Sequence, residues 1–479
     1  MEMRLVMFYI HFFICFFTCI IGNITVSAQE KWSLQKCVEY ATANNLQIKQ
    51  SILAQQTSEV NLFQNKLSIL PNLSGTAQQN FSFGRNINSS TNTYVVSNSN
   101  YNNFVINSDL TLFNGFNKIN QIKESEFDLE ANKKSTDQMV NDISLNVASA
   151  FLQVVLDKEQ LSVAQDQVDL SKESVDHTHK LVAGGALAEG SLFDVQAQLA
   201  KDQQSLVTAE NNLSLAILSL QQLLNLNKPV DTDVPSLEVT ADMLSINADP
   251  EKLYELALTT QPKVAEGQFK VNSFKKALTV VRGGYYPTLS LFGSISTSYS
   301  SIAQNAIYEP TGGFSPIGFV EGTNEIVESP TYGYTYQNIP FSTQFNNNLG
   351  KIIGVQLSVP IFNNWQNRGN VQRSKINLEN EQLNFSITKQ QLQKDVETAY
   401  MNAVGAVKSY LASQQSVESL KKAFDYATSK LNAGLITGID YDTAKNNYES
   451  AVSTLLQSKY TLIFDLKVLD FYQGTPLTL

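Results

Sequence analysis

The sequence predicts an α+β membrane protein built from a duplicated helix–β-hairpin–long helix–helix unit. Three observations lead to this fold class: an internal repeat on a scale of about 200 residues, long proline-free stretches with heptad spacing, and segments of about ten residues in which polar and apolar side chains alternate. The two halves of the chain therefore share one plan.

Composition excludes several classes of protein before any motif is considered. The 479 residues include 34 basic and 44 acidic side chains, a formal net charge of −10, and no run of Lys and Arg. A nucleic-acid partner is therefore excluded, because duplex binding needs clustered basic residues. The mean hydropathy of −0.15 excludes a polytopic helical membrane protein. The sequence contains no GxxxxGK[ST], HExxH or GxSxG motif, so we expect no enzyme, no cofactor and no metal.

The N-terminal segment 1–28 has the pattern of a secretory signal peptide. Arg4 precedes an apolar stretch over positions 5–21, and small residues follow up to Ala28. An uncleaved anchor and lipidation at Cys19 are the two alternatives. After cleavage at Ala28, Cys37 is the only thiol, so the mature chain has no intrachain disulfide.

The chain is a tandem duplication. Pro71 and Pro287 open matching segments with an offset of 287 − 71 = 216. Phe113 and Phe362 open later matching segments with an offset of 362 − 113 = 249. The offset grows by 249 − 216 = 33, so the second half is longer, and its extra residues must lie between Pro287 and Phe362.

Two segments of each half have the spacing of coiled-coil helices. Apolar or small residues recur every three or four positions from Ile143 to Val182 and from Leu392 to Leu431, and the stretches 117–182 and 366–432 around them contain no proline. Each stretch predicts one helix of about 100 Å at 1.5 Å per residue. The segments that follow each of them repeat the same spacing and predict returning helices.

Between the helices the period changes to two. Polar and apolar or small residues alternate in residues 72–82, 104–112, 289–296 and 355–359. Such segments are typical of a membrane β-barrel, with the half-buried strands of a soluble sheet as the alternative. The intervening residues 84–100 and 300–345 predict surface loops.

Four strands cannot enclose an interior, and an open sheet edge cannot face lipid because its backbone groups would lack partners. If the strands span a membrane, several copies must share one barrel. Two, three or four copies give 8, 12 or 16 strands, and composition does not choose among them.

The residues resemble the TolC-like outer-membrane efflux proteins over essentially all of residues 30–479. The segments that carry the resemblance are Trp32–Cys37, Pro71, Pro287, Leu112–Gly115, Ile361–Asn363, Ala433–Asp440 and Leu469–Gly474. The resemblance implies a homotrimer with a 12-stranded β-barrel in the outer membrane of a Gram-negative bacterium, continued by an α-helical barrel through the periplasm.

The resemblance and the duplication together predict nine segments. These are a signal peptide at 1–28, first helix 29–70, membrane β-hairpin 71–113, long helical pair 114–226, equatorial segment 227–249, first helix of the second repeat 250–286, second membrane β-hairpin with a long extracellular loop 287–362, second long helical pair 363–470 and C-terminal tail 471–479.

The function implied by the resemblance is the outer-membrane exit duct of a tripartite efflux or type I secretion system. Such a duct passively conducts substrates from an inner-membrane pump to the cell exterior. Its expected partners are that pump, a periplasmic adaptor protein and outer-membrane lipid. A non-conducting trimeric coiled-coil stalk is the alternative, and a porin would need eight or more strands in its own chain.

The resemblance also implies a constriction at the periplasmic tip. The family carries acidic residues six and nine positions after the tip glycine. In this sequence the residue six positions after Gly434 is Asp440, which matches, whereas the residue nine positions after it is Thr443. Asp442 lies one position before Thr443. The alternative role for Asp440 is a helix N-cap. We expect tip opening to break polar links among residues such as Lys180, Lys430 and Asp440.

The two tip turns are the expected contacts of the adaptor. Their residues are Gly184, Gly185, Ala433, Gly434, Leu435, Ile436 and Thr437. Ala183-Gly184 matches Ala433-Gly434 at an offset of 250, and aligning Ala197 with Ala444 makes the first tip three positions longer. His177 and His179 lie two positions apart and do not share a helix face, which favours a solvated stretch over a metal site.

Overall fold

The computed structural model describes residues 31–88, 92–96, 98–229, 231–233, 238–246 and 248–475. The predicted signal peptide, 1–28, lies outside the described residues. The chain divides into two compact units, each built from both halves of the sequence. Unit 1 contains residues up to 55 together with 131–267 and 384 onwards, and unit 2 contains residues 56–130 and 268–383.

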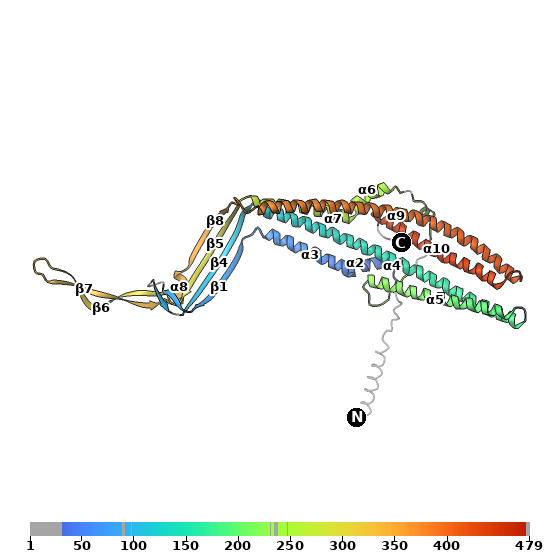
Figure 1. Ribbon diagram of the computed structural model, residues 1–479, viewed down its shortest axis with the longest axis horizontal. Coiled ribbons are helices and arrows are strands. Elements are labelled where there is room, and N and C mark those ends of the chain that lie inside the picture. The colour runs from blue at the N-terminus through green and yellow to red at the C-terminus, as the bar shows by residue number, and fades with distance from the viewer. Residues whose placement is uncertain are drawn as a thin grey trace, which may run out of the picture. The chain divides into compact units, whose positions relative to one another are not determined.

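Both halves have the same order of elements, as the duplication predicts (Figure 1). The first half consists of α2 Leu34–Asn44, α3 Leu46–Leu67, β1 Asn72–Ser82, β2 Arg85–Asn88, β3 Thr93–Val96, β4 Ser99–Asn114, α4 Asn117–Ala183 and α5 Glu189–Leu223. The second half consists of α6 Pro250–Thr260, α7 Pro262–Arg282, β5 Thr288–Ser300, β6 Gln304–Phe319, β7 Ile326–Asn338, α8 Phe341–Asn347, β8 Gly350–Ser358, α9 Gln366–Asn432 and α10 Gly438–Tyr472. Two short 3₁₀ turns, η1 Ala241–Leu244 and η2 Gly283–Tyr285, complete the described elements.

The long helices are continuous, which confirms the prediction from the proline-free heptad stretches. α4 and α9 have 67 residues each, or about 100 Å at 1.5 Å per residue. The returning helices α5 and α10 have 35 residues each. All four helices keep one offset between the halves, since the first positions of α4 and α9 differ by 366 − 117 = 249 and those of α5 and α10 by 438 − 189 = 249.

Each predicted first helix is two helices joined at a buried amide residue. Asn45 separates α2 from α3, and Gln261 separates α6 from α7, with extended backbone at both positions. The Asn45 side chain donates to the carbonyl of Leu223 at 3.0 Å, and Gln261 donates to the carbonyl of Phe471 at 3.4 Å. The break therefore attaches each first helix to the end of the returning helix of its own half, a tertiary contact that helical periodicity does not reveal.

The largest core lies in unit 1 and is centred on α4. Val147, Phe151, Val154 and Val155 are fully buried against residues of α2, α5 and α10. Among the described helices, only α4 contains an 18-residue window with the length and hydropathy of a membrane span, and half of that window is buried. Its apolar character is therefore explained by helix packing.

The four main strands form an antiparallel sheet with the order β1-β4-β5-β8 in unit 2. Its register places the alternating residues on two distinct faces. Leu291 pairs with Val355 and Leu289 with Leu357 on one face, while Asn107 pairs with Ser74 and Ser294 on the other. The apolar face is open, with Leu73 76% and Ile353 80% exposed. A soluble sheet of this kind would cover its apolar face, whereas this chain by itself leaves the face open.

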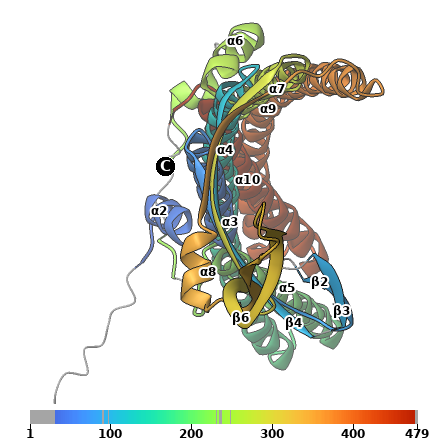
Figure 2. The same ribbon diagram turned by 90° about the vertical axis from the view of Figure 1, so that its left-hand side faces the viewer.

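The connections between the strand pairs contain β-structure where surface loops were predicted. Residues 84–100 include the ribbon β2–β3, and residues 300–345 include the ribbon β6–β7 and helix α8 (Figures 1 and 2). Positions 83–98 join β1 to β4 and positions 301–349 join β5 to β8, so the two connections differ in length by 49 − 16 = 33. The extra residues of the second half therefore lie in the ribbon β6–β7, its flanking turns and α8.

Candidate functional site

The predicted tip turns are two matching helix ends. In the first turn, the amide of Ala186 donates to the carbonyl of Leu181 at 2.9 Å and Gly185 has φ +74°. In the second turn, the amide of Leu435 donates to the carbonyl of Lys430 at 2.9 Å and Gly434 has φ +69°. Both are Schellman ends, which need a residue in the left-handed region and therefore favour glycine.

The structure corrects the predicted alignment of the two tips. Positions 184–188 join α4 to α5 and positions 433–437 join α9 to α10, so the turns have equal lengths and the first is not the longer one. Gly185, not Gly184, is the equivalent of Gly434, at the same offset of 249 as the helices. Because Gly184 and Gly185 are both glycines, the sequence does not indicate which of them has the positive φ.

Asp440 lies in the first turn of α10 and closes a capping box with Thr437. The Thr437 hydroxyl accepts from the amide of Asp440, and the Asp440 carboxylate accepts from the Thr437 hydroxyl at 2.7 Å and from its amide at 3.1 Å. These hydrogen bonds hold the pKa of the exposed Asp440 carboxyl below its usual value. The predicted N-cap role is therefore wrong in detail, because Thr437 is the N-cap and Asp440 is the third helical residue.

The first tip has no such box. Its N-cap is Ala188, which has no side-chain acceptor, and Ser191 occupies the position equivalent to Asp440. The two tips therefore share a backbone design, and each returning helix has one acidic residue in its first turn, Glu189 or Asp440, but only the second tip has a side-chain cap.

Asp442 has a different environment from Asp440. Its side chain is half-buried, and burial raises the pKa of its carboxyl; the carboxylates of Asp202 and Asp194 raise it further, against the lowering effect of Lys445. Two positions along a helix turn the side chain by about 200°, which places Asp442 toward α5 and leaves Asp440 in solvent. The two predicted constriction residues therefore do not share one surface of α10.

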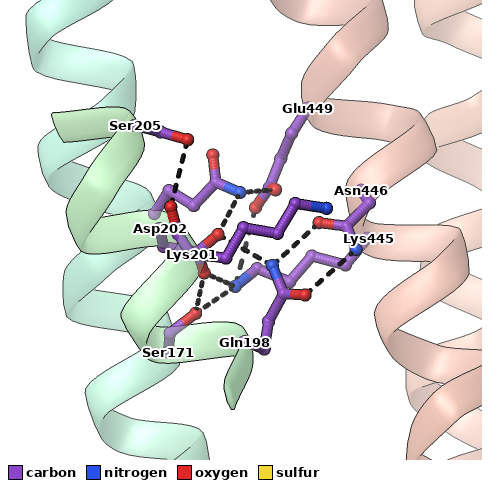
Figure 3. Close-up of polar contacts among 9 residues, drawn as sticks. Ser171, Gln198, Lys201, Asp202, Ser205, Lys445, Asn446 and Glu449 are labelled. Carbon is purple, nitrogen blue, oxygen red and sulfur yellow. Dashed lines mark hydrogen bonds and ion pairs between the residues drawn. The ribbon is translucent and has the colours of Figure 1, made fainter. Parts of the chain in front are cut away.

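A buried polar network lies near the tip turns, where α10 packs against α4 and α5 (Figure 3). Its centre is the Lys445 ammonium, which donates to the Ser171 hydroxyl at 2.7 Å and lies 3.7 Å from carboxylate oxygens of both Asp202 and Glu449. The side chains of Lys445, Asp202 and Glu449 are only 4%, 3% and 14% exposed. Charges this deeply buried are stable only when they are paired and hydrogen-bonded.

Amide and hydroxyl groups complete the network. Asp202 accepts from Gln198 at 2.7 Å, from Gln167 at 3.2 Å and from Ser171. Gln167 also donates to Glu449, and so connects α4 with both α5 and α10. Each carboxylate of the network therefore has a donor in addition to the shared ammonium.

The network contains a carboxyl group that titrates near neutral pH. Burial raises the pKa of Glu449 to about 7, with a further raising contribution from Asp202 and a lowering one from Lys445. Near pH 7 the network therefore exists both with Glu449 ionised and with Glu449 protonated.

Sequence reasoning missed Lys445, Asp202 and Glu449. A signal existed, because Asp202 lies three residues after Leu199 and four before Leu206, at a position of the heptad seam where an apolar residue is expected. The partners come from helices more than 200 positions apart, so only the tertiary structure identifies them.

The other candidate side chains at the tip are separate from one another. Lys180 pairs with Asp176 one turn away on α4, and Asp440 binds Thr437. Within the described part of the chain, the predicted links among Lys180, Lys430 and Asp440 are not formed. His177 and His179 are exposed, with the buried Thr178 between them.

The sequence is similar to a known family and to characterised proteins. Residues 38–226 and 253–474 match the family described as "Outer membrane efflux protein". The "Toxin and drug export protein A" of Aggregatibacter actinomycetemcomitans is 22% identical over 334 residues, which cover 68% of this chain and 63% of that protein. The "Outer membrane protein TolC" of Salmonella enteritidis is 21% identical over 348 residues, 71% of this chain and 62% of that protein. The matches thus span a little under two thirds of the length of these relatives.

Solved structures share the fold over almost the whole chain. CusC, described in terms of transmembrane channel formation, superposes with a TM-score of 0.75 at 16% identity, covering 94% of this chain and 96% of that one. The Campylobacter jejuni CmeC outer membrane channel gives a TM-score of 0.71 at 19% identity, covering 92% of this chain and 85% of that one. At these identities the superpositions establish the architecture.

Proposed function

Because the chain belongs to the outer membrane efflux protein family, we propose that it is the passive outer-membrane exit duct of a tripartite efflux or type I secretion system. Three copies would close one 12-stranded β-barrel in the outer membrane of a Gram-negative bacterium, and the long helices would continue it as an α-helical barrel in the periplasm. An inner-membrane pump selects the cargo and supplies the energy, and a periplasmic adaptor protein joins the pump to the duct.

The observation that carries this proposal is the open four-stranded sheet of unit 2. β1 and β8 are its edges, so half of their backbone N–H and C=O groups have no partner within the described sheet. One face is apolar and exposed, as a lipid-facing wall requires, and the other carries Asn107, Ser74 and Ser294. In lipid, unpaired edges are not tolerated, and four strands are too few to enclose a channel. Pairing of β8 with β1 of another copy satisfies both requirements.

The number of copies follows from the resemblance to TolC-like proteins, which implies a trimer. The name of one relative, a toxin and drug export protein, describes a cargo of that protein. For this chain we propose the duct without a named cargo, because the pump makes that selection. A duct needs no catalytic residues, no cofactor and no metal.

We further propose that Asp440 lines the narrowest point of the duct at the periplasmic tip. It is exposed, and two hydrogen bonds from Thr437 fix its carboxylate and keep it ionised at neutral pH. Three such carboxylates near one axis would favour cations over anions. Asp442 stays the second candidate, although its half-buried side chain lies nearer to Lys445.

The two tip turns are proposed as the contacts of the adaptor protein. Leu435 is 74% exposed and Leu187 42% exposed, so each turn presents one large apolar side chain. The residues of this proposed contact are Gly184, Gly185, Ala433, Gly434, Leu435, Ile436 and Thr437. Exposed apolar residues on small turns are suited to packing against helices of a partner.

Planar bilayer recording of the purified protein tests the proposal. The duct predicts small, cation-selective currents, and Asp440→Asn should raise the conductance and weaken the preference for cations. The matched control is Asp425→Asn, which removes an exposed carboxylate from α9 and should leave selectivity unchanged. Silent protein would support the structural stalk, and large unselective currents would support a porin.

A further inference from the structure

The ribbon β6–β7 has one aromatic face that is exposed. Cross-strand pairs place Tyr308 opposite Tyr334 and Phe314 opposite Pro330, on the face that also carries Tyr332 and Tyr336. Tyr308 stacks on Tyr332 with ring centroids 4.4 Å apart. Nevertheless Tyr308 is 58%, Phe314 65% and Tyr334 64% exposed. A two-stranded ribbon is marginally stable alone, so an aromatic face of this size requires a partner.

Charge is distributed unequally around this ribbon. Residues 304–338 contain four glutamates and no lysine or arginine. Glu309 pairs with Gly333 and so lies on the opposite face from Tyr308, and Glu321 and Glu325 lie in the connecting turn or at its ends. Only Glu328 shares the aromatic face. The face therefore suits an apolar partner that also carries a positive charge.

The base of the ribbon is fixed to the sheet. Gln344 of α8 is buried and donates to the carbonyls of Ser300 at 2.9 Å and Ile339 at 2.8 Å, on the two chain segments that enter and leave the ribbon. The Thr297 hydroxyl of β5 donates to the carbonyl of Phe345 at 2.7 Å. The ribbon therefore starts from a defined position between β5 and β8 (Figure 1).

The ribbon β2–β3 has the complementary properties. Arg85 pairs with Val96 and Ile87 with Tyr94, which places the four side chains on one face. Ile87, Tyr94 and Val96 are 54%, 65% and 84% exposed, and the Arg85 guanidinium lies over the Tyr94 ring at 4.3 Å. Arg85 is the only charged residue between positions 71 and 108. This face is apolar with one positive charge.

We propose that the aromatic face of β6–β7 is covered by the Arg85 face of β2–β3 from the neighbouring copy of the chain. This contact rests on the ring closure proposed as the function. The ribbon β6–β7 connects β5 to β8, and the ribbon β2–β3 connects β1 to β4. Pairing of β8 with β1 of the next copy therefore brings the ribbon β6–β7 next to the ribbon β2–β3 of that copy. The chain's own β2–β3 ribbon leaves the aromatic face exposed, so the neighbour's ribbon is the occupant. Alternating ribbons would then form a collar at the outer mouth.

Paired cysteines test this contact in the purified assembly. Tyr94→Cys combined with Tyr334→Cys should give disulfide-linked multimers on non-reducing gels after oxidation. Tyr94→Cys with Thr335→Cys, on the opposite face of β7, is the matched control and should give none. The native Cys37 thiol should stay unreactive, because it is fully buried and burial raises its pKa to about 12. Charge reversal by Arg85→Glu should reduce the yield of the cross-linked product severalfold.

The outcomes separate this contact from the proposed duct. The contact is supported if the protein has a trimeric mass and if linked multimers form with Tyr94→Cys and Tyr334→Cys but not with Tyr94→Cys and Thr335→Cys. A trimeric mass without links, or a link confined to one chain, overturns the contact and leaves the duct standing. Burial of the aromatic face in lipid would also overturn the contact. In that case the protein would be a trimer without links, and a water-soluble maleimide would label Tyr334→Cys in detergent but not in bilayers. A monomeric mass overturns the duct itself.

Discussion

Removing the Lys445 ammonium should loosen the tip half of α10 from α4 and α5. The substitution Lys445→Met keeps the length and the apolar stem of the side chain and deletes only the charge. It leaves Asp202, 3% exposed, without the cation that lies 3.7 Å from its carboxylate, and it removes the donor to Ser171 at 2.7 Å. The perturbation therefore acts on one buried charge while packing is largely kept.

The size of the effect follows from burial. At 3.7 Å an ion pair has an interaction of about 4 kcal/mol at an effective dielectric constant of about 20. Breaking a buried pair by removing one partner costs about 3–5 kcal/mol, because the other charge stays buried. At about 1.4 kcal/mol for each factor of ten, the opening equilibrium of this part of α10 should rise by about 10²- to 10³-fold.

Hydrogen exchange of the assembled protein at pH 8 measures this opening, because Glu449 is then largely ionised. Amides of residues 441–455 should lose about 10²- to 10³-fold protection in Lys445→Met. The matched control is Lys422→Met, which breaks the exposed pair with Glu418, 68% and 60% exposed, and should change protection by less than about threefold. The double variant Lys445→Met with Asp202→Leu should recover much of the loss. Unchanged protection in Lys445→Met, or a double variant worse than the single one, refutes the buried-charge explanation.

Two further predictions concern the protonation of Glu449 in the same network and the packing of Gly115 in unit 2. Burial raises the pKa of Glu449 from 4.5 to about 7, so its contribution to stability is full below pH 4.5 and is lost as pH rises through about 7. Hydrogen-exchange protection of residues 441–455, corrected for intrinsic exchange, should therefore fall over that range. The variant Glu449→Gln should remove this pH dependence. Gly115→Ala should lower the stability of unit 2 by about 2–4 kcal/mol in thermal unfolding, because Gly115 has φ +65° and the new Cβ would lie 2.5 Å from the carbonyl oxygen of Gly283. The control is Gly75→Ala, because Gly75 has open space around it. Equal melting temperatures of the two variants would contradict the prediction.

The long helices and the duplicated sheet could be predicted because their signals are local. A proline-free heptad pattern specifies a helix without reference to distant residues, and α4 and α9 are continuous over 67 residues each. Alternation with period two specifies which side chains share a strand face, and the register of the sheet confirms it. The additional residues of the second half lie between Pro287 and Phe362, as the two offsets predict.

Other features depend on contacts that a local pattern does not contain. The breaks have local causes, because Pro262 follows Gln261 and the Asn45 side chain caps α3, but the hydrogen bonds of both amides to carbonyls at the ends of α5 and α10 are tertiary. Residues 300–345 were predicted as a loop because Pro and Gly are typical of loops, whereas here the strands β6 and β7 pair, with Tyr308 opposite Tyr334.

The candidate site was predicted in part. The tip glycines can be found from the sequence and Asp440 follows from the resemblance to TolC-like proteins, but the equivalence of Gly185 with Gly434 requires the observed φ angles. The network around Lys445 unites three helices, and although Asp202 occupies a seam position of the heptad pattern, the sequence does not identify its partners. Only their mutual distances identify them as a buried cluster.

The central claim is that the open edges of the sheet are closed by other copies of the same chain. The molar mass of the detergent-purified protein, measured by light scattering with the detergent contribution subtracted, tests it most directly. Ring closure by three chains predicts a mass three times that of the mature polypeptide, and extraction from membranes only with detergent. A monomeric mass, or a protein that stays dispersed in buffer without detergent, contradicts it.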